Sequence, residues 1–272
     1  MTNNPDNKTV WVTGASSGLG LYCAKALCDA GFNVVGGARS FNKKELKHPF
    51  KALYLDVCDE KSCDEFVENA LKIYGEPYAL INAAGILHLS PCETIKTDEL
   101  HNVLNVNLLG THRMVRRVLP YMRKNNSGHI INFSSINGLF ATPYQGAYSA
   151  AKHAIEGFSE ALYMETARFG VFVTLVEPGD HKGGKTNYRL KENNLHDCYK
   201  NSYKNVVDKI TKDEDTGSDP ELLAKKIVRL IQGAIPPFRL VIADPFQKLS
   251  VLLKKLLPSK VFLSIVSKYY GV

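Results

Sequence analysis

The sequence predicts an α/β fold in which helices cover both faces of a doubly wound parallel sheet. Two observations lead to this expectation: short apolar runs alternate with amphipathic stretches up to Pro178, and a glycine-rich turn directly follows the first apolar run. Strands that alternate with helices require right-handed crossovers, which bury a parallel sheet on both sides. With 272 residues and 44% hydrophobic residues, the chain can form one large domain.

The apolar runs define the expected strands, and the amphipathic stretches define the helices. We expect strands at residues 8–12, 33–37, 52–55, 78–82, 129–133, 171–176 and 239–243. We expect helices at residues 21–30, 60–74, 98–124 and 147–169. A later helix should start at Asp219-Pro220-Glu221, because aspartate can cap a helix and proline fits its first turn.

Three segments lie outside this alternation. Residues 1–7 are a polar leader, and the polar residues 180–219 are long enough to form a substrate lid. Residues 246–272 form an amphipathic C-terminal extension, interrupted at Pro258. We interpret this extension as packing over the core. The alternatives are that it lines an apolar substrate pocket or, because Lys254, Lys255 and Lys260 lie nearby, that it touches a membrane surface.

Composition excludes several classes of protein. There is no apolar run of about 18 residues or more and no signal-peptide pattern, so we expect a soluble cytoplasmic protein without a membrane contact. The six cysteines form no C-x-x-C pair, which predicts free thiols and no metal site. A net charge of +7 comes without a nucleic-acid-binding signature, so we expect a basic surface and no nucleic-acid partner.

Three glycines separate the first strand from the first helix. Gly14, Gly18 and Gly20 would let the backbone turn tightly and a pyrophosphate approach the helix N-terminus. Their spacing, G-x-x-x-G-x-G, differs from the G-x-G-x-x-G dinucleotide fingerprint, so a purely structural turn is the alternative. At the end of the second strand, Arg39 would suit a 2′-phosphate, or it could be an ordinary exposed arginine.

Further polar and small residues follow the later strands. Asn82-Ala83-Ala84-Gly85 and Ser134-Ser135 each end a strand at the carboxyl edge, where open parallel sheets bind ligands. Tyr148 and Lys152 then lie one turn apart on one helical face. A phenol with a pKa of about 10 becomes a useful acid or base when a cation favours the phenolate. These segments should converge on one crevice.

Together these residues resemble the short-chain dehydrogenase/reductase family, whose fold is a Rossmann-type sheet. The resemblance spans residues 8–179 and includes T-G-x-x-x-G-x-G, N-A-A-G, a serine, Y-x-x-x-K and P-G. It implies that Tyr148 is the catalytic acid/base, that Lys152 lowers the pKa of Tyr148, and that Ser135 binds the substrate oxygen. The resemblance also favours Ser135 over Ser134, because the family's serine commonly lies thirteen residues before its tyrosine, and Ser135 is at this distance from Tyr148. Asn107 would hold the water of a proton relay.

The resemblance also implies a cofactor site that binds NADP(H) rather than NAD(H), because of Arg39. The expected cofactor-binding residues are Gly14, Ser16, Ser17, Gly18, Leu19, Gly20, Arg39, Ser40, Asp56, Val57, Asn82, Ala83, Ala84, Gly85, Tyr148, Lys152, Pro178, Gly179 and Thr186. Two positions depart from the family pattern. Ala83 replaces an asparagine, and Thr186 lies farther from Pro178-Gly179 than the threonine that contacts the nicotinamide.

The region around residues 158–180 and the C-terminal extension resemble hydroxysteroid and retinol dehydrogenases. The implied reaction interconverts a secondary alcohol and a ketone on an apolar small molecule, such as a hydroxysteroid or a bile acid. A retinoid or a small carbonyl compound is the alternative substrate, and a nucleotide-binding scaffold or sensor is the non-enzymatic alternative. The resemblance further implies a homodimer or homotetramer that pairs through helices 98–124 and 147–169.

Overall fold

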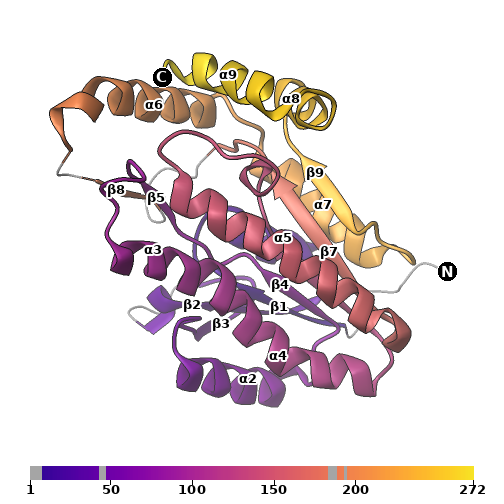
Figure 1. The fold of residues 1–272 in the computed structure, drawn as a ribbon. Helices are drawn as coiled ribbons and strands as arrows, with labels where there is room; N and C mark the ends of the chain where they lie inside the picture. Colours follow the sequence, from indigo (N-terminus) through magenta and orange to yellow (C-terminus); the bar gives the residue numbers. More distant parts are fainter. Residues whose placement is uncertain (1–7, 43–46, 183–188, 193–194) are drawn as a thin grey trace.

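The computed structural model describes residues 8–42, 47–182, 189–192 and 195–272. Its centre is a parallel sheet in the order β3-β2-β1-β4-β6-β7-β9 (Figure 1). The strands are β1 (Thr9–Thr13), β2 (Asn33–Ala38), β3 (Lys51–Tyr54), β4 (Ala79–Asn82), β6 (Gly128–Phe133), β7 (Val171–Pro178) and β9 (Arg239–Ile242). The strand order reverses between β1 and β4, which is where open parallel sheets form a ligand crevice. The predicted fold class is confirmed.

Two helical layers enclose the sheet. On one face, Trp11 of β1 packs in a core with α2 (Glu60–Tyr74), α4 (Gly110–Lys124) and α5 (Gly146–Thr166). On the other face, Val10 and Val12 pack with α1 (Gly18–Asp29) and α7 (Pro220–Gln232). Neighbouring residues of a strand point to opposite faces, so β1 is apolar on both sides.

The helix starts follow the capping residues in the sequence. The side chain of Asp59 caps α2 by accepting a hydrogen bond from the backbone of Lys61. Asp219 caps α7 in the same way, with Pro220 in the first turn, as predicted. Each cap satisfies an amide at a helix end that would otherwise lack a partner, and typically contributes about 1 kcal/mol.

The predicted continuous helix over residues 98–124 is wrong in its middle. The structure has α3 (Thr97–Leu104), a π-helical turn (Asn105–Leu109) and then α4. The side chain of Asn107 donates hydrogen bonds to the backbone oxygens of Val103 and Ile86, at 2.8 and 2.9 Å. These bonds draw the widened turn toward the sheet edge. Single π turns of this kind occur frequently at functional sites.

The segment 180–219 is not one long loop. Its described part contains β8 (Arg189–Lys191), which pairs with β5 (Leu87–Leu89), and the helix α6 (Asp197–Asp215). Tyr203, Val206 and Ile210 form the buried stripe of α6. Only three apolar residues mark this stripe, and the rest of the stretch is mostly polar. The sequence pattern therefore did not predict a helix there.

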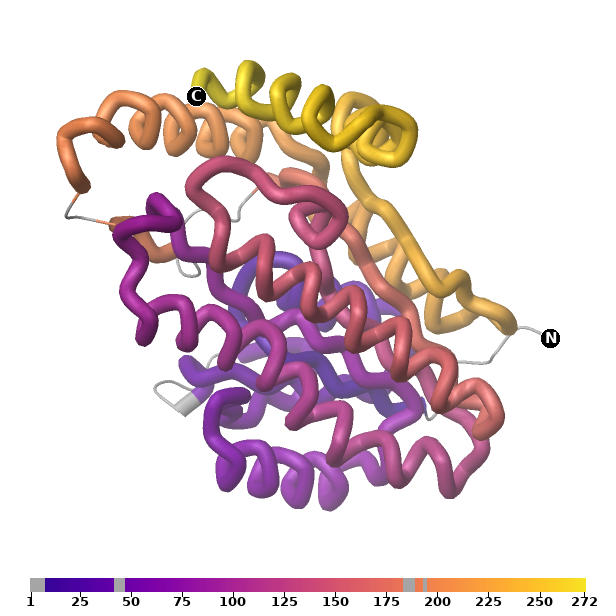
Figure 2. The backbone as a smooth tube through the Cα atoms, viewed as in Figure 1, coloured from indigo at the N-terminus to yellow at the C-terminus, as the bar shows by residue number. Residues whose placement is uncertain are grey.

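The C-terminal extension forms α8 (Pro245–Leu256) and α9 (Ser259–Tyr270), broken at Pro258 as predicted. Figures 1 and 2 show α6, α8 and α9 together above the carboxyl ends of the strands. Phe262 and Val266 of α9 pack against Ile136 and Phe140, so one face of the extension covers the core.

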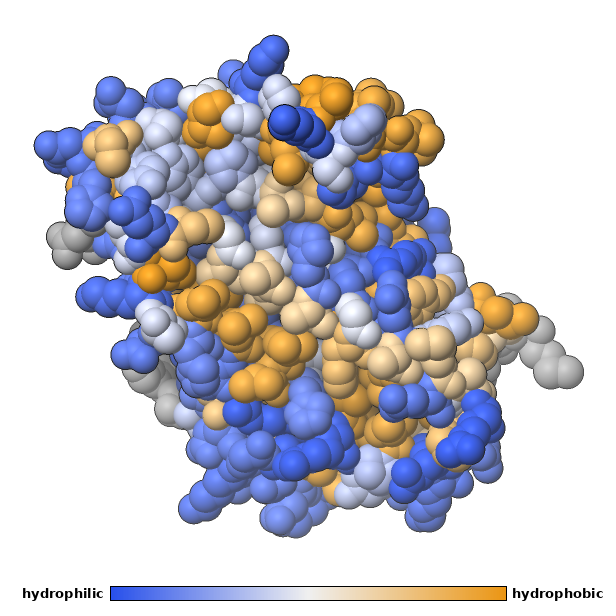
Figure 3. Space-filling model, viewed as in Figure 1, coloured by the Kyte–Doolittle hydropathy of each residue, from blue (hydrophilic) through white to orange (hydrophobic). Residues whose placement is uncertain are grey.

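The outer face of the extension keeps exposed apolar side chains (Figure 3). These residues are Phe246, Leu249, Leu252, Leu256, Leu263 and Ile265. Within the described residues, no helix is both long enough and apolar enough to cross a membrane. All six cysteines are free thiols in the structure, as predicted.

Candidate active site

A cavity of about 600 Å³ opens at the carboxyl ends of the strands, which is a volume typical of small-molecule sites. Most of the residues predicted to bind the cofactor or to act in catalysis line it. They are Gly14, Ser16, Ser17, Gly18, Leu19, Gly20, Arg39, Ser40, Asp56, Val57, Ala83, Ala84, Gly85, Asn107, Ser135, Tyr148, Lys152, Pro178 and Gly179. The structure therefore brings together segments from every part of the chain between β1 and β7.

The glycine turn is shaped by close backbone contacts. Gly14 has φ +69°, and a Cβ atom there would lie 2.8 Å from the Cα atom of Ala84. A Cβ atom on Gly20 would lie 2.5 Å from the backbone oxygen of Gly14. Any larger residue would push the turn away from the N-terminus of α1. The turn therefore leaves the positive helix end open to the cavity, which suits a pyrophosphate group.

The rim of the cavity near the glycine turn is polar. Arg39 is exposed and starts a short 3₁₀ helix (Arg39–Asn42) directly after β2. On the neighbouring loop, Asp56 accepts a hydrogen bond from the backbone of Cys58 at 2.9 Å, which holds its carboxylate at the cavity edge. A positive arginine and a fixed carboxylate are suitable partners for a phosphorylated ribose and an adenine.

One of the predicted cofactor residues does not line the cavity. Asn82 does not line it; instead the Asn82 side chain donates to Asn132 at 2.9 Å, and Asn132 donates in turn to Ser159. The role of Asn82 is to connect β4, β6 and α5 inside the protein. Thr186 lies outside the described residues.

Asn107 is fully buried, and its π turn packs beside α5. Its side-chain nitrogen donates to the backbone oxygens of Val103 in α3 and of Ile86 just before β5, while its side-chain oxygen has no hydrogen-bond partner among the described residues. A Cβ atom on Gly85 would lie only 2.7 Å from that oxygen. The glycine therefore avoids a clash with Asn107, and the side-chain oxygen of Asn107 remains an acceptor that a water molecule could use.

Ser135, Tyr148 and Lys152 meet at the centre of the cavity. The hydroxyl of Ser135 accepts a hydrogen bond from the backbone of Asn137 at 3.1 Å and is also hydrogen-bonded to the side chain of Tyr148. The ammonium group of Lys152 lies 5.5 Å from the centroid of the Tyr148 ring and donates to the backbone oxygen of Phe133 at 2.6 Å. Ser134, by contrast, has a buried hydroxyl with no partner in the described chain, so the geometry favours Ser135.

The pKa values in this centre favour a protonated phenol. Burial raises the pKa of Tyr148 to about 12; the hydrogen bond with Ser135 acts against this, and the charges of Asp180 and Glu214 add to it. Burial also lowers the pKa of Lys152 to about 8. The expected lowering of the Tyr148 pKa by Lys152 is therefore not seen in this arrangement, in which the lysine faces a backbone carbonyl. The phenol therefore stays protonated at neutral pH, but it is a weaker acid than an ordinary tyrosine.

The opposite end of the cavity contains residues that the sequence analysis did not predict. Asp180, Glu214 and Tyr270 line this end, and they come from the β7 loop, α6 and α9. Asp180 had a recognisable signal, because it directly follows the glycine at a strand's carboxyl end. Glu214 and Tyr270 had none, since only the tertiary fold brings α6 and α9 over the site.

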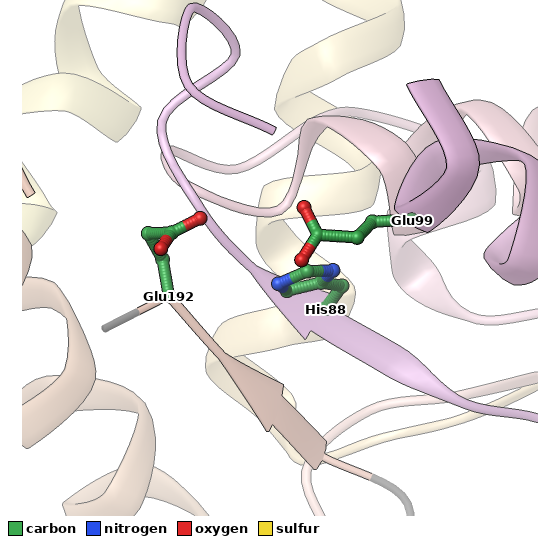
Figure 4. A group of neighbouring side chains, drawn as sticks. All are labelled: His88, Glu99 and Glu192. Carbon is green, nitrogen blue, oxygen red and sulfur yellow. The ribbon is translucent and has the colours of Figure 1, made fainter. Parts of the chain in front are cut away.

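The structure also gathers His88, Glu99 and Glu192, whose side chains point toward one another (Figure 4). Their potential ligand atoms all lie within 4.8 Å of one another. Glu99 accepts a hydrogen bond from the backbone of Lys96 at 2.9 Å and so closes the capping box of α3. Because Glu99 already has this structural role, we assign no ion to the cluster, and the absence of a metal site stays a prediction.

Comparison with known proteins decides the family. Residues 8–194 match the family model described as short chain dehydrogenase. The chain belongs to the short-chain dehydrogenase family. Members of this family are oxidoreductases that bind NAD(P)(H), and the cavity described above has the glycine turn and the polar rim that such a cofactor needs.

Relatives within the family cover most of the chain. A 3-ketodihydrosphingosine reductase of Bacteroides thetaiotaomicron is 35% identical over 265 residues, which are 97% of this chain and 98% of that protein. Retinol dehydrogenase 8 of Homo sapiens is 36% identical over 185 residues, 63% of this chain and 58% of that protein. A short-chain dehydrogenase from Streptomyces avermitilis matches the structure with a TM-score of 0.80 and 28% identity, covering 97% of each chain.

Proposed function

We propose that this protein is an NADP(H)-dependent oxidoreductase that interconverts a ketone and a secondary alcohol on a lipid. One observation carries the proposal: Ser135, Tyr148 and Lys152 meet inside a cavity whose other end is closed by α6 and α9. When bound, the nicotinamide cofactor supplies or accepts the hydride. The remaining chemistry, the proton and the developing charge on the substrate oxygen, belongs to the protein's own residues.

The proton path follows from the contacts of these residues. In the reducing direction, Tyr148 donates its phenol proton to the substrate oxygen, and Ser135 donates a hydrogen bond to the same oxygen as negative charge develops on it. Lys152 supports the phenolate that is left. Asn107 holds the water through which the proton returns, next to the space beside Gly85. The raised pKa of Tyr148 keeps the phenol protonated at neutral pH, which is the state in which reduction starts, and the transfer itself needs the positive charge of Lys152 to favour the phenolate.

The comparisons favour a long-chain keto lipid over a hydroxysteroid or a bile acid. The similarity to the 3-ketodihydrosphingosine reductase extends over nearly the whole of both chains and thus includes α6, α8 and α9, which lie at the substrate end. The similarity to retinol dehydrogenase 8 covers only 63% of this chain. We accordingly propose that residues 180–219 act as the lid over the lipid, with Ile210 and Glu214 of α6 facing it.

The cofactor preference rests on Arg39. Its exposed guanidinium at the cavity rim suits the 2′-phosphate of NADP(H), so replacing Arg39 with alanine should reduce the preference for NADPH over NADH by at least about tenfold. The measurement is kcat/KM with each cofactor. An unchanged ratio would contradict the assignment.

The activity itself is tested by following NADPH consumption optically. The panel contains long-chain 3-keto lipids, keto steroids, bile acids, retinal and small ketones. We expect turnover of the long-chain ketones, and a fall of about 10²–10⁴-fold in kcat for Tyr148→Phe. Full activity of Tyr148→Phe would rule out its role as the acid. Turnover of steroids alone would show that the substrate is a polycyclic lipid and not a long-chain ketone.

We also propose that the protein works in the cytoplasm as a homodimer or homotetramer, paired through α4 and α5. The free thiols support a reducing compartment. Met164 and Tyr163 of α5 are exposed in the single chain and are suitable interface residues. Light scattering of the wild type and of Met164→Lys tests the pairing, and a wild type that stays monomeric would contradict it.

A further inference from the structure

The substrate end of the cavity contains an acidic residue with no role in the proton path. Asp180 lies two residues after Pro178, whose backbone oxygen accepts a hydrogen bond from the hydroxyl of Ser135 at 3.4 Å. Two residues span at most about 7 Å, so Asp180 is close to the serine that is proposed to bind the substrate oxygen. Its charge also acts on Tyr148. Asp180 thus lines the same cavity as the residues proposed to bind the carbonyl oxygen.

The Asp180 carboxylate is held in a fixed position. The side-chain nitrogen of Gln247 donates to one carboxylate oxygen at 2.5 Å, and the backbone nitrogen of Asp180 donates to the Gln247 side-chain oxygen at 3.1 Å. Gln247 belongs to α8, so the C-terminal extension orients this side chain. In the described part of the chain, the second carboxylate oxygen has no hydrogen bond, and Asp180 lines the cavity.

Among the described residues, no positively charged side chain is one of the main influences on the pKa of Asp180. The charges that perturb it are those of Glu214, Asp213 and Asp244, and only the hydrogen bond from Gln247 favours its ionised form. Burial, followed by these charges, raises the pKa of Asp180 to about 7. Arg189 pairs with Glu214, and Lys182, which also lines the cavity, is exposed to solvent. A half-buried carboxylate among other acids favours a cationic partner.

We propose that Asp180 forms an ammonium-binding subsite, so that the preferred substrate is a lipid ketone with an amino group next to the reacting carbonyl. This inference rests on the proposed function. The ammonium would pair with the carboxylate of Asp180 while the carbonyl oxygen contacts Ser135 and Tyr148, giving the substrate two polar contacts on adjacent carbons. Such a pair of contacts fixes which carbon faces the cofactor. The alkyl chain would lie along the apolar residues of the cavity, such as Leu87 and Ile210.

The experiment compares two ketones on the purified full-length protein with NADPH. One is 3-ketodihydrosphingosine, which has an amino group on the carbon next to its ketone. The other is the same molecule with hydrogen in place of the amino group. We expect the wild type to prefer the amino ketone in kcat/KM, and Asp180→Asn to reduce this preference about 30-fold, which corresponds to about 2 kcal/mol for a lost charge pair.

Asparagine keeps the size of the side chain and can still accept the hydrogen bond from Gln247. The control variant is Asp208→Asn, which removes an exposed negative charge of α6 outside the cavity lining and should leave the preference unchanged. An unchanged preference in Asp180→Asn would overturn the subsite. An equal loss for both ketones would also overturn it, because that result indicates a structural role for Asp180.

A binding measurement separates this inference from the proposed function. If neither ketone is reduced, the proposed function fails, and calorimetric titration with dihydrosphingosine and its deaminated analogue still decides the subsite. Tighter binding of the amine by the wild type, lost in Asp180→Asn, would support it. Equal affinity for the two molecules would refute it. If only the deaminated ketone is reduced, the enzyme assignment stands and the ammonium subsite is wrong.

Discussion

Replacing Lys152 with methionine should make the folded protein more stable while removing its activity. The Lys152 side chain is only 5% exposed. Burial lowers its pKa to about 8, although the charge of Glu156 acts in the opposite direction. Its ammonium donates to one backbone oxygen, that of Phe133. At neutral pH the folded protein thus holds a cation that would be better solvated in the unfolded chain.

The size of this effect follows from the pKa shift. The difference between the usual value of 10.5 and about 8 is worth roughly 3 kcal/mol as an upper limit, and methionine fills a similar volume without a charge. We expect a gain of about 1–3 kcal/mol at pH 7. For a chain of this length the entropy of unfolding is about 0.6 kcal/mol/K, so the Tm should rise by roughly 2–5 °C.

The decisive test is the direction in which the stability difference between the wild type and Lys152→Met changes with pH. Because the folded pKa lies below the unfolded one, the unfolded chain binds more protons between pH 8 and 10.5. The Lys152 contribution to wild-type stability therefore rises with pH across this window, and the corresponding rise is absent in Lys152→Met. The stability advantage of the variant should be fully present below pH 8 and disappear above pH 10.5.

Thermal unfolding followed by circular dichroism, together with NADPH consumption, measures both effects. The matched control is Lys225→Met, which removes an exposed lysine of α7 and should change neither stability nor activity appreciably. We expect kcat of Lys152→Met to fall about 10²-fold or more. A variant that is less stable than the wild type at pH 7 would refute the reasoning, because it would show that the contacts of the buried ammonium outweigh its desolvation.

Three further predictions concern other parts of the structure. Gly85→Ala should fold normally but lower kcat, since the new Cβ atom would displace the side-chain oxygen of Asn107, and steady-state kinetics beside a circular dichroism spectrum checks this. Arg239→Met should destabilise the protein by about 2–3 kcal/mol at pH 7 and less at pH 5, where Glu177, whose pKa burial raises to about 7, is protonated; urea unfolding at both pH values measures it. Phe262→Ala should cost about 3–5 kcal/mol in the same urea assay, because this ring anchors α9.

The sequence was sufficient for the sheet and for the cofactor end of the cavity. Both depend on local patterns: apolar runs form the strands, and the glycine turn, Arg39 and the Tyr148–Lys152 pair each lie directly after a strand or within one helical turn. In a parallel sheet the carboxyl ends of all strands meet at one edge. Residues that follow the strands therefore come together without any knowledge of long-range contacts.

Features that depend on side-chain direction were not predictable in the same way. Asn82 lies at the correct strand end, yet its side chain points into the protein toward Asn132. The π turn around Asn107 is fixed by a contact with Ile86 in a different segment. The pKa of Tyr148 depends on Asp180 and Glu214, which the chain places over the site only after α6 has packed. Each of these features depends on tertiary contacts, which the local sequence propensities do not describe.

The contrast between the predictable cofactor end of the cavity and its unpredictable substrate end has a physical consequence for substrate specificity. The cofactor end is built from strand ends, which the sheet holds rigidly, whereas the substrate end combines the β7 loop with α6, α8 and α9. A change in the C-terminal helices can therefore alter the chemistry around Asp180 without disturbing the hydrogen bonds of Ser135 or Lys152. Gln247 is the residue through which α8 holds Asp180. Gln247→Ala should therefore loosen Asp180, and we expect it to raise KM for the amino ketone several-fold more than it lowers kcat. Equal effects on both constants would show that α8 supports the catalytic centre instead.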